Sequence, residues 1–242
     1  MASSPLALPP ALPAELLTYV LTYQSPIILI ICQPRSTFLS SLLGSINSPQ
    51  VQQNPDDDAG GDPTEQPSVP EPPKQHPLLI PTLRQVAASR YINLVFINTV
   101  SHFRAYLAGF PAPEKEHGAA ETKSGDRPQG LRPLVVVYGL IGLHHDTSEW
   151  SAQGLGSSVA GLVEAGWRTR QRILVLEERL EDGGDGEEMP REVWEERLPM
   201  LNGNVRRAGL EGEDAVWSGR TVEVRRVLGR WFKFKKSGWI EK

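Results

Sequence analysis

The 242-residue sequence contains a single cysteine, Cys32, so no disulfide can form within the chain. Chains without a disulfide framework are typical of reducing intracellular compartments, and we expect this protein to work in one. The sequence also lacks a long hydrophobic segment, because the apolar run from Ile27 to Cys32 is far shorter than the roughly 20 residues that span a bilayer. Its start, residues 1–13, lacks the basic residues that open a signal peptide. We therefore expect a soluble protein with no membrane partner.

Residues suited to metal binding or hydrolysis are scarce. The chain has five histidines, and two of them are adjacent in His144-His145-Asp146. Adjacent histidines in a loop rarely converge on one ion, and no further histidine or cysteine follows at ligand spacing, so we predict no metal site. No Gly-x-Ser-x-Gly sequence is present to hold a hydrolase serine. Cys32 lies within an apolar segment, where a cysteine is typically a small buried residue rather than a nucleophile.

Charge is unevenly distributed, although the formal net charge is only −4. Acidic residues dominate between Glu177 and Glu196, and basic residues dominate from Gly203 to Lys242. The two regions could compensate each other or serve different partners. Near the end of the chain, cationic side chains stand among aromatic ones, a pattern that favours single-stranded nucleic acid through phosphate contacts and base stacking. The alternative is that the rings pack in the core while the cations form a solvated face.

Four continuously apolar segments have the character of strands that are buried on both faces. They lie at 25–32, 92–97, 134–138 and 172–177. Segments with a helical spacing of apolar residues stand between them. This alternation predicts an α/β fold with a mainly parallel central sheet flanked by helices.

Polar stretches rich in proline, glycine and charge set the predicted boundaries, because such stretches cannot bury enough surface to offset the entropy of ordering. Near the end of the chain, residues 221–224 and 227–234 alternate apolar and polar side chains, and we predict two antiparallel edge strands there. The predicted layout is a flexible N-terminus at 1–13 and one domain over 14–242, with disordered insertions at about 47–76, 111–130 and 181–190.

The loop after the first apolar segment has the length and the proline of a phosphate-binding loop but not its chemistry. A strand that runs into a loop and then a helix is where a P-loop lies. The segment from Gln33 to Ser40 resembles the G-P-x-x-x-G-K-T loop of RecA-like recombinases, and in particular of the divergent eukaryotic recombinase paralogues. Glutamine replaces the first glycine, phenylalanine the second, leucine the lysine and serine the threonine. The compared positions are Gln33, Pro34, Phe38, Leu39 and Ser40.

Two further stretches resemble the same family in the same order. Residues 134–143 are similar to the strand that carries the family's magnesium-binding aspartate, and Tyr138 takes the place of that aspartate. Residues 96–100 resemble F-I-D-A-E, and Val100 takes the place of the water-activating glutamate. The resemblance implies a RecA-like P-loop NTPase core with no catalytic residue and no bound cofactor, since phosphoryl transfer depends on the groups that are missing. The vestigial nucleotide site is expected to be filled by side chains, Phe38, Leu39 and Tyr138 among them.

The resemblance also implies that the protein works in a complex. We expect a non-catalytic subunit of a recombination-mediator assembly of the Shu type, which supports homologous-recombination DNA repair in the nucleus. Its partners are expected to be other recombinase-paralogue-like subunits, and single-stranded or forked DNA is a further candidate. Two alternatives remain open: a subunit of the Elongator RecA-like ring that binds transfer RNA, and an ATP-binding subunit whose site a neighbouring subunit completes. The residues expected to contact DNA or a partner are Arg206, Arg207, Arg225, Arg226, Arg230 and Lys233.

Overall fold

The computed structural model describes residues 4–23, 25–47, 76–110, 133–179, 193–200 and 220–235. The three expected insertions lie almost entirely outside these residues. Within the described part of the chain, no helix is long and apolar enough to cross a membrane.

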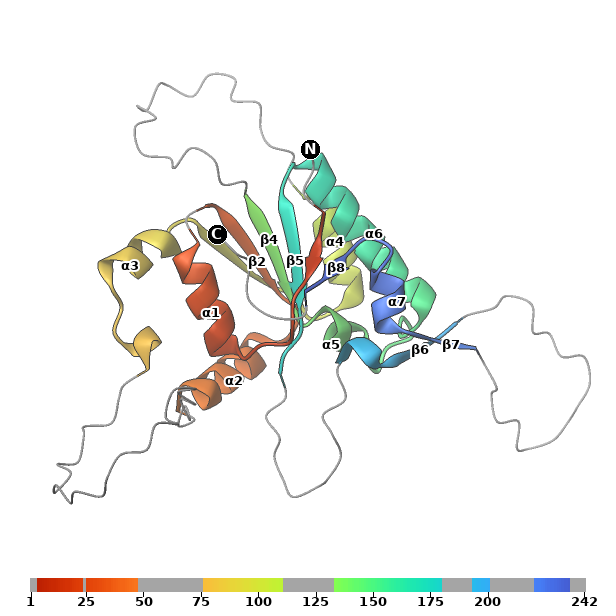
Figure 1. Ribbon diagram of the computed structural model, residues 1–242, viewed down its shortest axis with the longest axis horizontal. Helices are drawn as coiled ribbons and strands as arrows, with labels where there is room; N and C mark the ends of the chain where they lie inside the picture. Colours follow the sequence, from red (N-terminus) through yellow and green to blue (C-terminus); the bar gives the residue numbers. More distant parts are fainter. Residues whose placement is uncertain are drawn as a thin grey trace, which may run out of the picture.

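A six-stranded sheet forms the centre of the molecule, with the strand order β3-β2-β4-β5-β1-β8 (Figure 1). All of its paired strands run parallel. The sheet confirms the predicted α/β class and the mainly parallel central sheet, and the four apolar segments of the sequence supply β2 to β5. The strands are β1 (Leu6–Ala7), β2 (Ile27–Ile31), β3 (Ile92–Phe96), β4 (Leu134–Tyr138), β5 (Arg172–Leu176) and β8 (Lys233–Phe234).

Helices cover both faces of this sheet, which explains why β4 is apolar at every position. One face packs against a buried cluster that includes Leu16 and Phe38, and the other against a cluster that includes Phe103 and Val159. On the first face lie α1 (Pro13–Thr22), α2 (Arg35–Asn47), the 3₁₀ turn η1 (Pro77–Leu79) and α3 (Leu83–Ser89). On the second lie α4 (Val100–Ala108), α5 (Leu140–His144), α6 (Ala152–Arg168) and α7 (Val224–Leu228).

The prediction of a flexible N-terminus at 1–13 was wrong. Residues 6 and 7 form β1, which pairs with β5 on one side and with β8 on the other. Ala7 and the following Leu8 are completely or almost completely buried. The strand has only two residues and prolines stand on both sides of it, so its local sequence carries no strand pattern. Its conformation is set by partners more than 160 residues away in the chain.

The prediction for the C-terminal edge strands was right for one strand and wrong for the other. Residues 221–223 form β7 (Thr221–Glu223), which pairs antiparallel with β6 (Arg197–Pro199) in a separate two-stranded sheet. Residues 224–228 form the helix α7 instead, and β8 then runs parallel to β1. The helix wins because Val224, Val227 and Leu228 stand at helical spacing and are all buried.

Candidate functional site

The carboxyl ends of the parallel strands meet at one edge of the sheet, and this edge is where ligands bind in α/β proteins of this kind. Binding positions lie between neighbouring strands whose following helices go to opposite faces. β2 is followed by α2 on the first face, whereas its neighbours β3 and β4 are followed by helices on the second face, so such a position lies on either side of β2. A further position lies between β5 and β1. β1 is followed by α1 on the first face, and the 3₁₀ turn η2 (Val193–Glu195), the next described element after β5, packs on the second face.

Aromatic side chains fill the position between β2 and β4. The ring of Phe38, at the start of α2, lies 6.0 Å from the ring of Tyr138 and 6.0 Å from that of Phe96, centre to centre. Both contacts are edge-on, which is a favourable arrangement for aromatic pairs. Phe38 and Tyr138 are buried. The three rings therefore occupy the carboxyl ends of these strands.

The other residues of the expected vestigial site do not converge on these rings. Leu39 is 41 % exposed on the outer side of α2. The hydroxyl of Ser40 donates to the carbonyl of Ser36, one turn back in the same helix, at 3.0 Å. Gln33 is half-buried, and Pro34 accepts the first backbone hydrogen bond of α2 from Phe38. Of the expected set, the structure therefore brings together Phe38 and Tyr138.

The position between β5 and β1 is closed by the loop of residues 8–12, which joins β1 to α1. The N–H of Leu8 donates to the carbonyl of Val175 at 2.9 Å, and that of Ala11 donates to the carbonyl of Glu177 at 2.9 Å. The N–H of Leu12 donates to the Glu15 carboxylate at 2.9 Å. The two remaining residues, at positions 9 and 10, are prolines and have no N–H. Every backbone donor of this loop is thus used or absent, so the loop cannot cradle a phosphate as a P-loop does.

Tyr138, at the end of β4, connects the position between β2 and β4 to the loop of residues 8–12. Its hydroxyl donates to the carbonyl of Ala11 at 3.0 Å across the buried edge. The same carbonyl also accepts the N–H of Arg179, whose guanidinium forms an ion pair with Glu15 at 3.1 Å. Where the resemblance puts a magnesium ligand, this protein has a tyrosine that holds the neighbouring loop in place.

A buried carboxylate occupies the centre of the edge. Glu177 follows β5 directly and is only 3 % exposed. Its two oxygens accept the N–H groups of Ile141 at 2.9 Å and of Gly142 at 3.5 Å, in the first turn of α5. Burial raises the pKa of Glu177 to about 8, against the lowering effect of these hydrogen bonds. The carboxylate takes the place that an external anion would need.

The cysteine at this edge is not activated. Cys32 follows β2 and is buried beside the backbone of Gly139, which adopts a left-handed conformation with φ of 80°. Burial raises the pKa of the Cys32 thiol, and the charge of Glu177 raises it further. The thiol is therefore protonated at neutral pH, as the sequence predicted for a core cysteine.

The adjacent residues His144 and His145 contact different parts of the protein. His144 is completely buried, and its ring nitrogens contact the carbonyl of Leu140 at 2.8 Å and the hydroxyl of Ser158 at 2.9 Å. His145 instead contacts the carboxylate of Glu196 at 3.0 Å near the surface. Among the described residues, no group of three or more metal-ligating side chains comes together. No local pattern in the sequence predicts the role of His144, because the hydroxyl that its ring contacts lies on another helix, α6.

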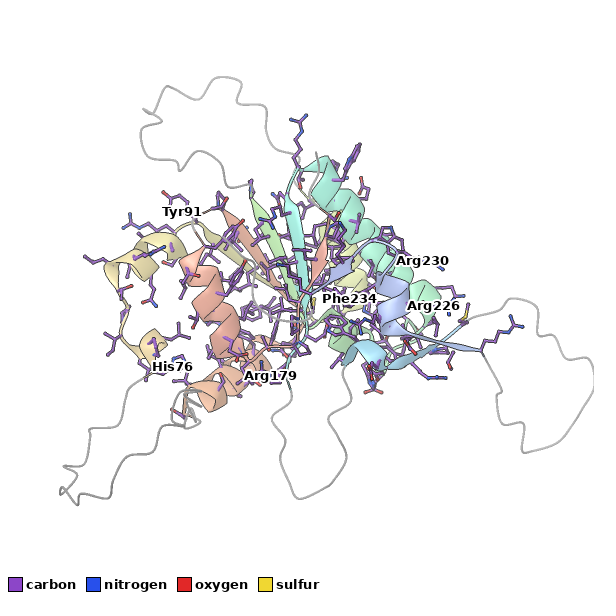
Figure 2. The ribbon with its side chains drawn as sticks, in the orientation of Figure 1. His76, Tyr91, Arg179, Arg226, Arg230 and Phe234 are labelled. Atoms are coloured by element: carbon purple, nitrogen blue, oxygen red, sulfur yellow. The ribbon has the colours of Figure 1, made fainter. Side chains whose placement is uncertain are left out.

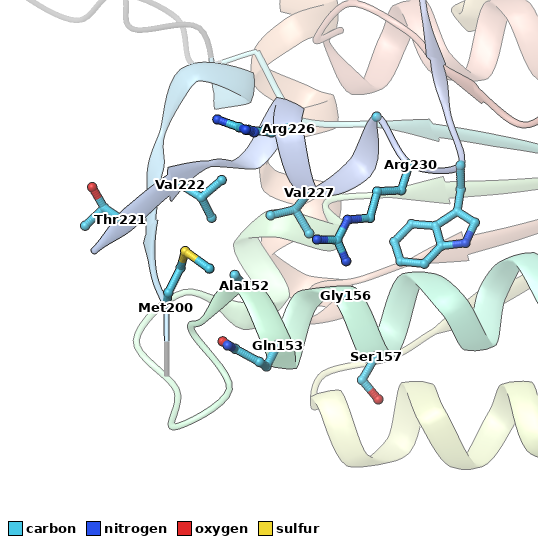
Figure 3. Close-up of a pocket in the computed structure, with 12 residues that line it drawn as sticks. Ala152, Gln153, Gly156, Ser157, Met200, Thr221, Val222, Arg226, Val227 and Arg230 are labelled. Atoms are coloured by element: carbon cyan, nitrogen blue, oxygen red, sulfur yellow. The ribbon is translucent and has the colours of Figure 1, made fainter. Parts of the chain in front are cut away.

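A groove of about 780 Å³ lies between α6, α7 and the β6–β7 pair (Figure 3). Arg226 and Arg230, both exposed, line it together with the half-buried ring of Trp231. Among the described residues that line the groove, none is acidic. The floor contains small residues of the first turns of α6, Ala152 and Gly156, which leave the space open. This combination of two guanidinium groups and a ring can bind an anion that carries a flat apolar part.

The remaining predicted contact residues lie elsewhere. Arg225 has its guanidinium 5.0 Å from the centre of the Phe234 ring, so it is engaged within the protein. Lys233 is exposed on β8 and is not among the residues that line the groove. Arg206 and Arg207 lie outside the described residues. Of the six residues predicted to contact DNA or a partner, the groove therefore brings together Arg226 and Arg230.

Comparison with solved structures gives only distant similarity. No protein-family model and no curated protein sequence matches the chain. A solved DnaB-like replicative helicase, described with its interactions with primase, is similar at 12 % identity and a TM-score of 0.35. The similarity covers 72 % of this chain and 38 % of the helicase chain. The protein thus spans well under half the length of that helicase, and no activity is transferred from it.

Proposed function

We propose that this protein is a RecA-like subunit without catalytic activity, which serves a recombination-mediator complex in homologous-recombination DNA repair in the nucleus. The observation that carries the proposal is the closed carboxyl edge. The loop of residues 8–12 has no backbone N–H to offer a phosphate, and Glu177 occupies the nearest helix N–H groups. A protein that keeps a nucleotide-binding architecture but fills its binding position acts by contact with partners.

The RecA-like assignment rests on three stretches of sequence that resemble the recombinase paralogues. If the resemblance is sound, these stretches surround one position in the fold. Phe38, Phe96 and Tyr138 come from the three stretches, and the Phe38 ring contacts each of the other two rings. The three stretches thus lie side by side at the carboxyl ends of β2, β3 and β4, as the resemblance requires, and this supports the proposal.

Within the proposed function, the groove between α6 and α7 is the surface that contacts single-stranded DNA. Arg226 and Arg230 supply charge for phosphates, and the Trp231 ring is a surface on which a base can stack. The surrounding segment 220–235 contains one acidic residue, Glu223, which lies outside the groove lining. The charge of this region therefore favours a polyanion.

Reversing the two groove charges is expected to abolish most DNA binding. The variant Arg226→Glu/Arg230→Glu should bind a fluorescent oligo(dT) of about 20 nucleotides at least ~10-fold more weakly, because two phosphate contacts become repulsive. The measurement is fluorescence anisotropy at fixed salt. The matched control is Arg84→Glu/Arg90→Glu, which changes the net charge equally on α3 and beyond it, away from the groove. Equal losses in both variants would show that the groove is not the binding site.

Because the carboxyl edge of the sheet is closed, we predict that the protein does not bind ATP. A fluorescent ATP analogue with magnesium should give no saturable signal with the purified protein, and none should appear when the partner subunits are added. The loop of residues 8–12 would have to break three backbone hydrogen bonds to receive a phosphate. Saturable binding that depends on a partner would instead support an ATP site completed between subunits.

Affinity capture from nuclear extract with mass spectrometry tests the cellular assignment. Recovery of recombinase paralogues supports the mediator proposal, and a variant of the groove should retain these partners while losing DNA. Recovery of Elongator subunits would contradict it. In that case, a binding competition between transfer RNA and single-stranded DNA would show which of the two nucleic acids the groove prefers.

A further inference from the structure

Exposed hydrophobic side chains gather at the end of the molecule that is formed by β3, α2, η1 and α3. Of the nine large hydrophobic residues that are exposed in the described part of the chain, six lie in these elements and two more, Ile80 and Tyr91, lie directly after η1 and directly before β3. The ninth is Trp167, on α6. This end lies opposite the groove along the long axis of the molecule, with His76 and Tyr91 on one side and Arg226 and Arg230 on the other (Figure 2). We call it the apolar end; its members include Leu43, Leu79, Ile80, Leu83, Val86 and Tyr91.

The helix α3 shows most clearly that the described structure does not cover this surface. It has only seven residues, and none of them is buried. Its start is well capped, because the Gln85 N–H donates to the Thr82 hydroxyl at 3.2 Å and the Thr82 N–H donates to the Gln85 side chain at 2.8 Å. Yet Leu83 is 90 % exposed. A helix this short gains its stability mainly from packing an apolar face, and α3 packs only its side towards α1.

The charge of the apolar end has one sign. Residues 25–47 and 76–110, which supply all of its elements, contain no aspartate and no glutamate. They do contain Arg35, Arg84 and Arg90, which are all exposed. A fourth arginine, Arg104, is held by Glu149 at 2.6 Å on the other face of the sheet. Among the described residues of these elements, the charged side chains are therefore all arginines, and a carboxylate from another element, that of Glu178, accepts a hydrogen bond from Ser41 on α2.

We propose that the apolar end is the docking surface for a protein segment that presents apolar side chains flanked by carboxylates. Exposed apolar surface of this extent at one place marks an interaction site, and the arginines select the charge of the partner. A second copy of this chain fits poorly, because a symmetric contact would set the same arginines against each other. The inference rests on the proposed function in one respect, since it names the surface by which the subunit joins its complex.

Two synthetic amphipathic helical peptides test this surface with the full-length protein. Both carry leucine on one face, and the polar face carries glutamate in one peptide and lysine in the other. We expect the glutamate peptide to bind at least ten times more tightly by fluorescence anisotropy, and less tightly as salt is raised. The variants Leu83→Ser/Val86→Ser and Arg84→Glu/Arg90→Glu should each lose at least ten-fold. Trp167→Ser is the matched control, because it removes an exposed hydrophobic side chain outside the apolar end, and it should bind as the wild type does.

Four results would overturn the proposal. Equal binding of both peptides, or equal binding by the wild type and the apolar-end variants, would mean that this surface does not select an acidic partner. A dimer in light scattering that Leu83→Ser/Val86→Ser dissociates would assign the surface to a second copy. Sedimentation with phosphatidylserine vesicles in the absence of peptide binding would assign it to a membrane. None of these measurements uses DNA or a recombination protein, so failure here and failure of the repair assignment are distinguishable.

Discussion

Replacement of Ala7 by aspartate is expected to destabilise the folded protein by about 3–5 kcal/mol and to lower its melting temperature by more than about 5 °C. Ala7 has no exposed surface and lies in β1, between β5 and β8. Its neighbours in register are Val175 and Phe234, so a carboxylate there would stand among apolar side chains without a cation. An uncompensated buried charge costs about 3–5 kcal/mol. That cost is a large part of the ~5–15 kcal/mol by which a typical domain is stable.

Circular dichroism during thermal unfolding measures this effect. The matched control is Ser4→Asp, which adds the same carboxylate three residues earlier, at an exposed position. The control should melt within about 2 °C of the wild type, because exposed substitutions change stability little. An Ala7→Asp variant that melts with the control would mean that residues 6–7 are not part of the sheet.

The stability of the protein is expected to fall as the pH rises from about 4.5 to about 8, owing to Glu177. Burial raises the pKa of this carboxyl from 4.5 to about 8 in the folded protein. A carboxyl whose folded pKa is raised stabilises the fold fully below its unfolded pKa, and this contribution disappears as the pH passes the folded pKa. Each pKa unit corresponds to about 1.4 kcal/mol, so the loss amounts to a few kcal/mol across the window.

The free energy of unfolding in urea at several pH values between 5 and 8.5 checks this prediction. Other groups also titrate in this range, among them His144, whose pKa is lowered by burial. The difference between the wild type and Glu177→Gln isolates the contribution of Glu177, and this difference should change steadily with pH. The exposed substitution Glu223→Gln should follow the wild type at every pH. A constant difference between the wild type and Glu177→Gln would show that the carboxylate is ionised throughout.

The sequence was sufficient for the parts of the fold that local patterns determine. β2 and β4 are continuously apolar and β-branched, and such segments suit strands that are covered on both faces. β1 could not be found in this way, since two residues between prolines carry no periodicity. α7 was missed for a different reason. Its buried residues satisfy helical spacing, but in so short a segment that spacing is hard to distinguish from alternation.

In the candidate site, too, the sequence predicted the residues that a local pattern marks and missed those that long-range contacts bring in. Phe38 and Tyr138 were found from the order of residues along the chain, because each stands at a fixed place after a strand. Glu177 and the loop of residues 8–12 were not found, although they close the edge most tightly. Apart from the bond between Leu12 and Glu15, their hydrogen bonds join residues that are 35 or more positions apart, so no local sequence pattern predicts them. The groove depends likewise on α7 lying across the start of α6, and the sequence showed only that Arg226 and Arg230 are basic.

The place of β1 in the sheet has a consequence for synthesis. Its two hydrogen-bonding neighbours are β5, which begins at residue 172, and β8, which begins at residue 233. β1 can therefore join the sheet only after the segment of β5 has been synthesised, more than 160 residues later, and its other edge stays unpaired until residues 233 and 234 follow. Folds dominated by such long-range pairings form slowly and expose apolar segments while they wait. Until β8 is in place, the unpaired backbone groups of β1 form an open sheet edge, to which another chain can pair.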